Sequence, residues 1–497
     1  METTTTLAGT EINKDALYFV DWNNLKGVED LVLIFACMGL SFSGFPKALS
    51  YNLRSLSGFS KQNVRLTPDK YDSVKPNDTI KVDLPQNTLV DLRTFTMYYE
   101  GIGDTNCHFP RLTGSMIKTL SVYINGNLVE RIDNYSVLFN RLYDMDGGGI
   151  DQLAKRHLEN ADPSVYYDTG IATTSVNTGV FNITAAKDAI KRKYAITSWL
   201  GLLSSISTPI IDTNDLNRVT IEITLESANV MWQKQSLTRV TAPGYTLSDV
   251  HFMINKVVFN DPLYYNMKAS KLLSSGLTLS YQTFVASKGA LASKSSSFNV
   301  YTSVNTTSLD QLICCFTPED QTTSNLLLAT HWAASGAKPF NYVLGLDSHE
   351  SEVTGVSCGG YFNQSRYFRS DACGLTSIAW TINNTPLTQQ PLTDYESYNE
   401  TLIALGHNHQ DMSIGTFPGL NSLAAYLKYF FINICSLEMI NAGDIYRSGL
   451  DGKSSSLSIV LSASYGANTS DKVTPYIFAK TTRILQINEG HAVSVIV

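Results

Sequence analysis

The sequence is poor in charged residues. Asp, Glu, Lys and Arg together make up 16% of its 497 positions, whereas about 25% is usual in globular proteins. The acidic residues number 44 and the basic residues 37, which gives a formal net charge of -7. Proteins that bind nucleic acid present a broad basic surface to the phosphates, so this balance argues against that class. We interpret the local basic cluster Lys191–Lys193 as a solvated turn.

Long apolar runs are also missing. The longest run near the N-terminus, Leu31–Leu40, covers ten positions, whereas a membrane-spanning helix needs about 20. The first residues, Met1–Thr6, are polar and acidic, unlike the basic start of a secretory signal. We therefore expect no transmembrane segment. Residues 31–40 are expected to pack on protein, with contact to a membrane face or a neighbouring subunit as the alternative.

The cysteines lack the spacing of a metal or disulfide framework. Their number is odd, they are scattered, and no CxxC pair occurs; they are Cys37, Cys107, Cys314, Cys315, Cys358, Cys373 and Cys435. Zinc ligation and a disulfide scaffold are both disfavoured by this pattern. We expect reduced, mostly buried thiols. The adjacent Cys314 and Cys315 should point to opposite faces of a strand, which argues against a shared metal.

Sequence motifs of common enzymes are absent as well. The chain has no phosphate-binding loop, dinucleotide-binding motif, nucleophile elbow or zinc-protease motif. His407 and His409 would share one face of a strand and could bind a metal, but that needs a third His and a carboxylate. His349, Glu350 and Asp411 are the nearest candidates in the sequence. We interpret the His pair as part of a polar loop.

Three further patterns resemble metal-binding or catalytic sites. Asp144–Gly149 resembles the start of a calcium loop but lacks the third ligand and the terminal Glu. Cys107 and His108 are neighbours on a strand, so their side chains diverge. Glu222 and Glu226 share one face of a strand, which we assign to a solvated sheet face. The sequence therefore predicts a protein that is not an enzyme, with no catalytic, cofactor-binding or metal-binding residues.

The abundant residue types favour strands and turns. Tyr (26) and Phe (21) are frequent, and Thr, Ser and Asn are plentiful. Val219–Leu225 alternates strictly between apolar and polar residues and predicts a strand with one buried face. Asn125–Gly126 lies between two apolar stretches and predicts a tight hairpin. Helical patterns are confined to residues 28–38 and 150–160, so the chain is predicted to be all-β with short helices and long loops.

Two sequence markers occur twice in the same order. The Ile-Asn turn of Val122–Leu128 reappears in Trp380–Leu387, 258 positions later when Ile124 is matched to Ile382. The strand Val219–Leu225 is echoed by Leu457–Ser462, 238 positions later when Ile221 is matched to Ile459. Each turn is followed by Tyr-rich sequence, namely Tyr135 in the first half and Tyr395 and Tyr398 in the second. This order predicts two copies of one β-domain, whose Tyr-rich stretches, if they are surface loops, suit protein–protein contacts.

The repeat defines the expected domain organisation. Residues 1–50 are predicted to be an N-terminal arm with a short helix. The first β-domain covers 51–240 and the second covers 241–475, with the alternating segment Val250–Asn255 opening the second half. Residues 476–497 have further strand character and are expected to be a C-terminal tail that docks on a neighbour.

Two stretches carry a family resemblance. Phe109–Gly126 is similar to part of the first jelly roll in polinton-like relatives, and Asp212–Leu225 is similar to the closing strands of that domain. With the two β-domains, the arm and the lack of catalytic motifs, the chain resembles a double-jelly-roll major capsid protein of the tectivirus–adenovirus lineage. That lineage includes virophages, polinton-like viruses, adintoviruses and nucleocytoplasmic large DNA viruses. The resemblance covers roughly residues 45–464 and is one of architecture.

The resemblance implies a specific role. Each subunit would hold two consecutive eight-stranded jelly rolls, and three subunits would form a pseudohexameric capsomer in the icosahedral shell of a double-stranded DNA virus. The implied partners are the chain itself, neighbouring capsomers, and penton and minor capsid proteins. Contact with an internal membrane would involve the N-terminal arm. The implied location is the virion, after synthesis and assembly inside the host cell.

Two other functions stay open from the sequence. A β-sandwich spike or glycan-binding attachment protein would use the same fold, with a shallow aromatic sugar site in an exposed loop. A two-domain hydrolase or metal-dependent oxygenase would use His407 and His409 as ligands.

Overall fold

The computed structural model describes residues 59–103, 107–110, 112–145, 191–233, 244–259, 262–274, 276–318, 370–406, 423, 426–427, 430–438, 449–452, 456–466, 472–488 and 492–496. The predicted arm (1–50), the predicted helix at 150–160 and the pair His407 and His409 lie outside these residues.

The first half of the chain forms a sandwich of two antiparallel sheets. The larger sheet has the order β1 (Phe59–Leu66), β11 (Tyr245–Phe259), β3 (Leu89–Gly103) and β7 (Lys191–Ile196), with β8 (Ile210–Asp212) also paired to β3. The smaller sheet has the order β2 (Thr79–Asp83), β9 (Val219–Leu225), β5 (Ile117–Ile124) and β6 (Asn127–Ile132). A separate short pair joins β4 (Cys107–His108) to β10 (Trp232–Gln233).

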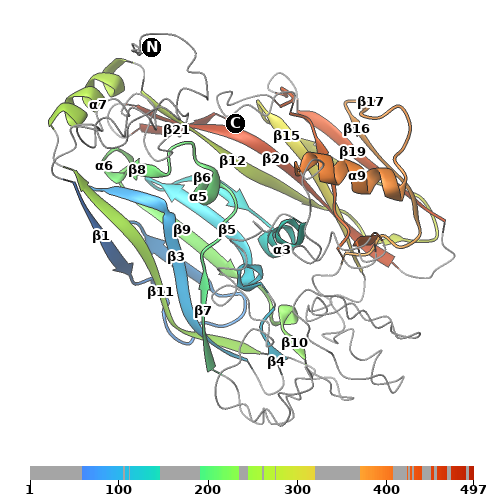
Figure 1. Cartoon of the computed structure of the whole chain (residues 1–497), viewed down its shortest axis with the longest axis horizontal. Helices are drawn as coiled ribbons and strands as arrows, with labels where there is room; N and C mark the ends of the chain where they lie inside the picture. The colour runs from blue at the N-terminus through green and yellow to red at the C-terminus, as the bar shows by residue number, and fades with distance from the viewer. Residues whose placement is uncertain are drawn as a thin grey trace, which may run out of the picture.

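The second half repeats the order of the four main strands in each of the two sheets. Its larger sheet has the order β12 (Leu277–Lys288), β20 (Lys472–Asn488), β15 (Leu309–Pro318) and β18 (Asn433–Ser436), with β13 (Ala292–Ser293) and β21 (Ala492–Ile496) also on β20. Its smaller sheet has the order β14 (Phe298–Val304), β19 (Leu457–Tyr465), β16 (Leu375–Ile382) and β17 (Thr385–Pro386). Figure 1 shows the two sandwiches side by side. The predicted all-β class with two jelly rolls is confirmed.

Helices are short and connect strands. They are η4 (Thr113–Met116), α3 (Tyr135–Met145), α5 (Leu202–Ser205), α6 (Thr213–Leu216), η7 (Ala228–Val230), α7 (Pro262–Ser274) and α9 (Asp394–Ala404). The helix α3 follows β6 in the first sandwich, and α9 follows β17 in the second, so these two helices occupy equivalent places in the chain. No helix among the described residues is long and apolar enough to cross a membrane.

The two hairpin turns have the same geometry. Asn125 and Gly126 have φ values of 50° and 79°, and Asn383 and Asn384 have 49° and 64°. Positive φ at both central residues is the type I′ pattern, which Asn and Gly adopt most readily. The predicted hairpin at Asn125–Gly126 is therefore confirmed, together with its copy.

Strand pairing corrects the second marker of the repeat. Ile124 pairs with Val219 in the first sandwich, and Ile382 pairs with Ile459 in the second. Val219 is thus equivalent to Ile459, a spacing of 240 positions rather than the predicted 238. A shift by two residues keeps every side chain on its own face of the sheet, so the alternation in the sequence fits both alignments equally well.

Three predicted segments have a different structure. The alternating segment Val250–Asn255 does not open the second half, because it lies in β11 and pairs with β1 and β3. Residues 476–488 are not a tail, because they lie in β20, between β12 and β15. The basic cluster Lys191–Lys193 is a strand paired to β3 rather than a turn.

These pairings suggest revised domain limits. We propose that the first jelly roll runs from β1 to β11 and ends at Phe259. The second would run from β12 at Leu277 to β21, and helix α7 would link the two. On this division, the first jelly roll ends with a strand of its larger sheet, and the second begins with a strand of its larger sheet.

The alternation of β9 determines which residues form the core. Ile221 is fully buried, and it faces Val82 on one side and Val122 on the other. Leu461 holds the equivalent place in the second sandwich, fully buried between Val300 and Trp380.

We expect Ile221→Ala and Leu461→Ala each to lower the free energy of unfolding by about 3 kcal/mol, because each removes a side chain that its neighbours cannot replace. Urea unfolding followed by tryptophan fluorescence would measure the loss. Ser458→Ala, on an exposed position of β19, is the control and should change stability by less than about 0.5 kcal/mol. Equal effects of all three variants would contradict this assignment of the core.

Candidate functional site

The residues considered for chemistry do not form a reactive site in the described part of the chain. His349, Glu350, Asp411 and the pair His407 and His409 lie outside it, as do Gly147–Gly149 and the side chains of Cys107 and His108. Among the described residues, no group of three or more His, Cys, Asp or Glu is placed to hold a metal ion.

The Glu222 and Glu226 pair is divided between surface and interior. Glu222 is partly exposed and lies 3.5 Å from Lys81 Nζ. Glu226 is buried and accepts a hydrogen bond from Ser136 Oγ at 3.2 Å. The prediction that both lie on a solvated face is wrong for Glu226, because β9 ends at Leu225 and the alternation of the strand no longer applies beyond it.

The described cysteines are mostly buried thiols, as predicted. Cys314, Cys315 and Cys435 are buried, and Cys373 is exposed; none of the four is in a disulfide bond. Cys314 and Cys315 are adjacent on β15, so both faces of this strand are covered. Burial raises the pKa of Cys315 to about 12, although the nearby charge of Arg141 lowers it. A thiol that stays protonated is a poor nucleophile and a poor metal ligand.

The most elaborate site lies where the two sandwiches meet. Strand β12 is an edge strand of the larger sheet in the second sandwich. Residues 205–207 of the first sandwich lie along this edge and form hydrogen bonds with it. Ser205 Oγ accepts from Gln282 N at 2.9 Å and donates to Gln282 O at 3.0 Å. Ser207 N donates to Ser280 O at 2.8 Å, and Ser280 N donates to Ser207 Oγ at 3.2 Å. We call this contact region the joint; it comprises β6, α5 and residues 205–207 on one side and β12 and β20 on the other.

The joint also has an apolar layer. Leu202, Leu203 and Ile206 from the first sandwich line the same small cavity as Leu279 and Leu485 from the second. Burial of this apolar surface supplies the non-directional part of the attraction between the sandwiches. The hydroxyl and backbone hydrogen bonds then set the register of one sandwich against the other.

A buried carboxyl lies within the joint. Glu130 on β6 is almost fully buried, and its oxygens accept from Leu202 N at 2.9 and 3.1 Å. Gly201 has a φ of 78°, and a Cβ atom there would collide with the Glu130 carboxyl group. Only glycine therefore allows the chain to approach the carboxyl so closely.

The second sandwich covers Glu130 from β12 and β20. The titratable groups there are the Tyr281 hydroxyl, which donates to Val129 O at 3.0 Å, and the Arg483 guanidinium. Burial raises the pKa of Glu130 from 4.5 to about 7, while the Thr283 hydroxyl, the Leu202 N–H and the charge of Arg483 lower it. Burial has the largest effect on the pKa of Glu130, so the joint favours the protonated carboxyl group.

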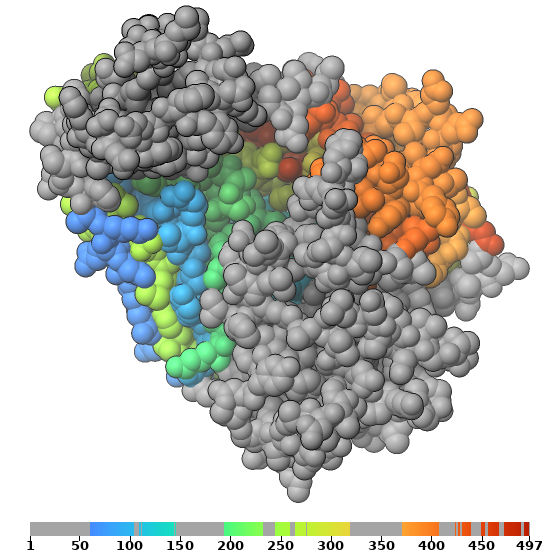
Figure 2. Space-filling model, viewed as in Figure 1, coloured from blue at the N-terminus to red at the C-terminus, as the bar shows by residue number. Residues whose placement is uncertain are grey.

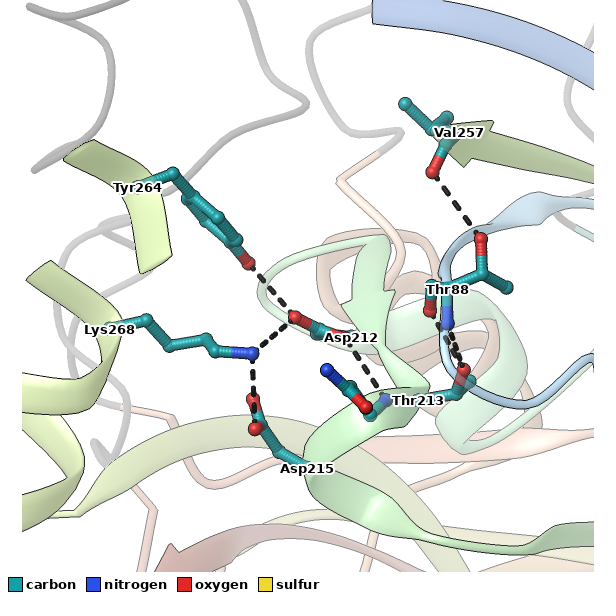
Figure 3. A network of polar contacts seen from close by, with 8 residues as sticks. Thr88, Asp212, Thr213, Asp215, Val257, Tyr264 and Lys268 are labelled. Carbon is teal, nitrogen blue, oxygen red and sulfur yellow. Dashed lines mark hydrogen bonds and ion pairs between the residues drawn. The ribbon is translucent and has the colours of Figure 1, made fainter. Parts of the chain in front are cut away.

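The helix α7 is held by an ion-pair cluster (Figure 3). Lys268 Nζ lies 2.6 Å from Asp212 Oδ2 and 3.1 Å from Asp215 Oδ1, and all three side chains are mostly buried. Tyr264 Oη donates to the same Asp212 oxygen at 3.4 Å. Thr213 anchors the short helix α6, which carries Asp215, to Thr88 through a hydroxyl bond of 2.7 Å. This cluster connects α7 to the end of the first sandwich from which α7 departs.

The Tyr-rich stretches form helices rather than loops. Tyr135 begins α3, is fully buried, and accepts from Leu200 N at 3.0 Å. Tyr395 lies on α9 and is 69% exposed. Tyr398 packs edge-on against Tyr426, with ring centroids 4.8 Å apart. Only Tyr395 among the three is therefore available to a partner.

Sequence patterns did not indicate the joint. Glu130 lies in Asn-Leu-Val-Glu-Arg-Ile, which is an ordinary strand with polar residues. Lys268 is one of several polar residues on a helix of weak amphipathicity. The unusual Gly201 was a possible signal, but a single glycine before a short helix has many explanations.

We expect Glu130→Gln to remove part of the pH dependence of stability. The wild-type protein is stabilised by the protonated carboxyl below about pH 4.5, and this contribution is lost as the pH rises to about 7 and beyond. The difference between the two limits is about 3 kcal/mol. Thermal unfolding from pH 5 to pH 8 should therefore show a smaller decline in Tm for Glu130→Gln than for the wild type.

The control for this experiment is Glu222→Gln, since Glu222 is partly exposed on the same sandwich. Its Tm profile should be parallel to that of the wild type. A decline in Tm that is equally steep in Glu130→Gln and in the wild type would show that Glu130 does not titrate in this range.

Comparison with known proteins gives matches at the level of structure. No family model matches the sequence, and no curated protein matches it. One similar structure is the VP54 protein of the virus PBCV-1, a crystal structure that was fitted into a reconstruction of the Sputnik virophage. It superimposes with a TM-score of 0.53 and 11% sequence identity, and the match covers 88% of this chain and 97% of VP54. A quasi-atomic model of the PBCV-1 capsid gives the same values.

A third similar structure is the mavirus major capsid protein, with a TM-score of 0.49 and 10% identity over 99% of this chain and 96% of that chain. The assignment of the fold rests on the PBCV-1 matches, which span nearly the whole of both chains, and on the repeated strand order described above. The chain has the double-jelly-roll fold of these capsid proteins.

Proposed function

We propose that the protein is a major capsid protein. The observation that carries this proposal is the repeated strand order of the two sandwiches, together with a superposition that covers 88% of this chain and 97% of VP54. A chain with two like sandwiches fixed side by side has large flanks for contact with its neighbours. Such a subunit suits a structural role in a virion and is not expected to be an enzyme.

We further propose that the protein assembles into trimeric capsomers. Three subunits, each with two jelly rolls, would form a homotrimer of roughly hexagonal outline, and such capsomers would build the icosahedral shell of a double-stranded DNA virus. The hydrogen bonds and apolar contacts of the joint support this, because a capsomer needs its jelly rolls at fixed angles. Penton and minor capsid proteins would be further partners, and assembly would take place inside the host cell. The N-terminal arm would contact an internal membrane where one is present.

The expected state of the purified chain is a trimer. Size-exclusion chromatography with light scattering should give a mass three times the subunit mass of 54.8 kDa, and negative-stain images should show six-lobed particles. A monomer that persists over a wide range of concentration and salt would contradict the proposal. Specific binding on a glycan array by such a monomer would favour an attachment protein instead.

A further inference from the structure

The helix α7 carries a lysine that lies between two carboxylates. Lys268 Nζ is 2.6 Å from Asp212 Oδ2 and 3.1 Å from Asp215 Oδ1. The side chains of Lys268 and Asp212 are each 10% exposed, and that of Asp215 is 11% exposed. One ammonium group thus faces two carboxylates in a site from which most water is excluded. Because buried charges lose their hydration, a reaction that removes one pair of opposite charges lowers the cost of burying this cluster.

Aromatic rings flank the lysine. Its Nζ atom lies 5.8 Å from the ring centroid of Tyr264 and 5.4 Å from that of Tyr265. Tyr264 also packs with Ile210 against a small apolar cluster on β3 and β11. Exclusion of water favours a condensation that releases water, and it protects the product from hydrolysis.

The two oxygens of the Asp212 carboxyl group have different partners. Oδ1 accepts a hydrogen bond from Asn214 N at 3.0 Å. Oδ2 lies next to Lys268 Nζ and accepts from Tyr264 Oη at 3.4 Å. A fixed N–H on Oδ1 draws electron density from the Cγ atom, as the donors of an oxyanion hole do. The Cγ atom is bonded to Oδ2 and so lies beside the lysine nitrogen, which places a nucleophile, a polarised carbon and a leaving oxygen together.

We propose that Lys268 and Asp212 form an intramolecular amide bond and that Asp215 transfers the proton for this reaction. The bond would join α7 to the junction of β8 and α6, 56 positions earlier in the chain. It would form within a single chain and does not depend on the proposed assembly.

The bond would fasten the chain where it passes between the two sandwiches. The helix α7 follows β11 and precedes β12. In Figure 2, the yellow-green residues of β11 lie beside the blue residues of the first strands at one end of this face, and the orange residues around α9 lie at the other. A covalent link from α7 to the first sandwich would therefore hold the start of the crossing in place, and it would restrict the unfolded chain as a disulfide does.

The reaction balances without a further reagent. The Lys268 ammonium passes one proton to the Asp215 carboxylate, and the lone pair of the neutral amine attacks Asp212 Cγ. The Nζ–Cγ bond forms and the Cγ–Oδ2 bond breaks. Oδ2 leaves as water with the proton that Asp215 returns and with a second proton from Nζ. Of the three ammonium protons, one stays on the amide nitrogen and two leave in the water, and Asp215 is again a carboxylate.

The charges of the cluster slow the first step. Burial lowers the pKa of Lys268, but the hydrogen bonds and charges of Asp212 and Asp215 outweigh burial and raise it. The side chain is therefore an ammonium at neutral pH, and attack requires prior proton transfer to Asp215. We expect the bond to form after folding and not to form where residue 215 cannot accept a proton.

A second buried ion pair provides an internal comparison. Lys294 Nζ is 2.7 Å from Asp371 Oδ1, and the two side chains are 3% and 9% exposed. Among the residues that the structure describes, no second carboxylate forms an ion pair with Lys294. This pair has no separate group to accept the ammonium proton, so it should stay ionic.

Mass spectrometry of the intact, denatured chain tests the proposal. After incubation at neutral pH, the wild type should be lighter by one water molecule than Asp215→Asn, once the mass of the substitution itself is subtracted. Asp215→Asn keeps both reacting side chains, and its ends are processed as in the wild type. Lys268→Arg, which keeps the positive charge, should also retain the water. The matched control Asp371→Asn should lose the water as the wild type does.

Peptide mapping of the wild type locates the bond. Trypsin should not cleave after Lys268, and the peptide 194–218 should be recovered joined to the peptide 257–271. Fragmentation of the joined peptides should place the link between Asp212 and Lys268.

A wild-type chain that keeps its full sequence mass after prolonged incubation would overturn the proposal. So would a loss of water that maps to Lys294 and Asp371, or one that persists in Asp215→Asn with a native circular dichroism spectrum. The map of the wild type decides the question even if Asp215→Asn does not fold. Because these measurements concern a single chain, a negative result leaves the capsid proposal in place.

Discussion

The free edge of β12 must be covered, and the position of the first sandwich follows from this requirement. An exposed edge strand offers unpaired backbone groups to any other strand. Ser205 and Ser207 satisfy these groups in Ser280 and Gln282 through paired hydrogen bonds. Once that register is set, β6 has to lie against Tyr281, and α3 has to lie against the outer face of β15. The two sandwiches are therefore joined by direct contacts along β12 as well as through the chain.

Polar groups in the joint provide orientation more than stability. A buried carboxyl such as Glu130 costs desolvation energy that its few hydrogen bonds offset only in part. The same holds outside the joint for Lys268 between Asp212 and Asp215, where the ion pairs replace hydration that was already favourable. Apolar surfaces such as Leu202 against Leu485 tolerate sliding, whereas these directional contacts are satisfied in one arrangement only. Gly201 belongs to the same arrangement, since a side chain there would displace Glu130.

Local patterns in the sequence predicted the parts of the fold that depend on local physics. The alternation of Val219–Leu225 and the turn at Asn125–Gly126 were sufficient for the smaller sheets and for the repeat. The prediction of the domain limits failed at β20, which is buried on both faces. Its residues, Lys472–Asn488, mix polar and apolar types without a regular period, so the pattern did not indicate one long strand. The expected boundary between residues 240 and 241 was also misplaced, because β11 follows it and still pairs with strands of the first sandwich. Glu130 could not be predicted, since its burial depends on a sandwich more than 140 positions away.

The two sandwiches share one strand order but differ in how far their equivalent strands and helices are buried. The internal joint forms as the chain folds, at a high effective concentration, so it can include a buried carboxyl and a fully covered helix. The edge strands equivalent to β12 and β6, namely β1 and β17, carry residues that discourage indiscriminate strand pairing. The strand β1 has Lys61 and Arg65, and β17 has Pro386, which lacks a backbone N–H. The strand order of the two copies is the same, while Tyr395 on α9 is 69% exposed and Tyr135 on α3 is buried.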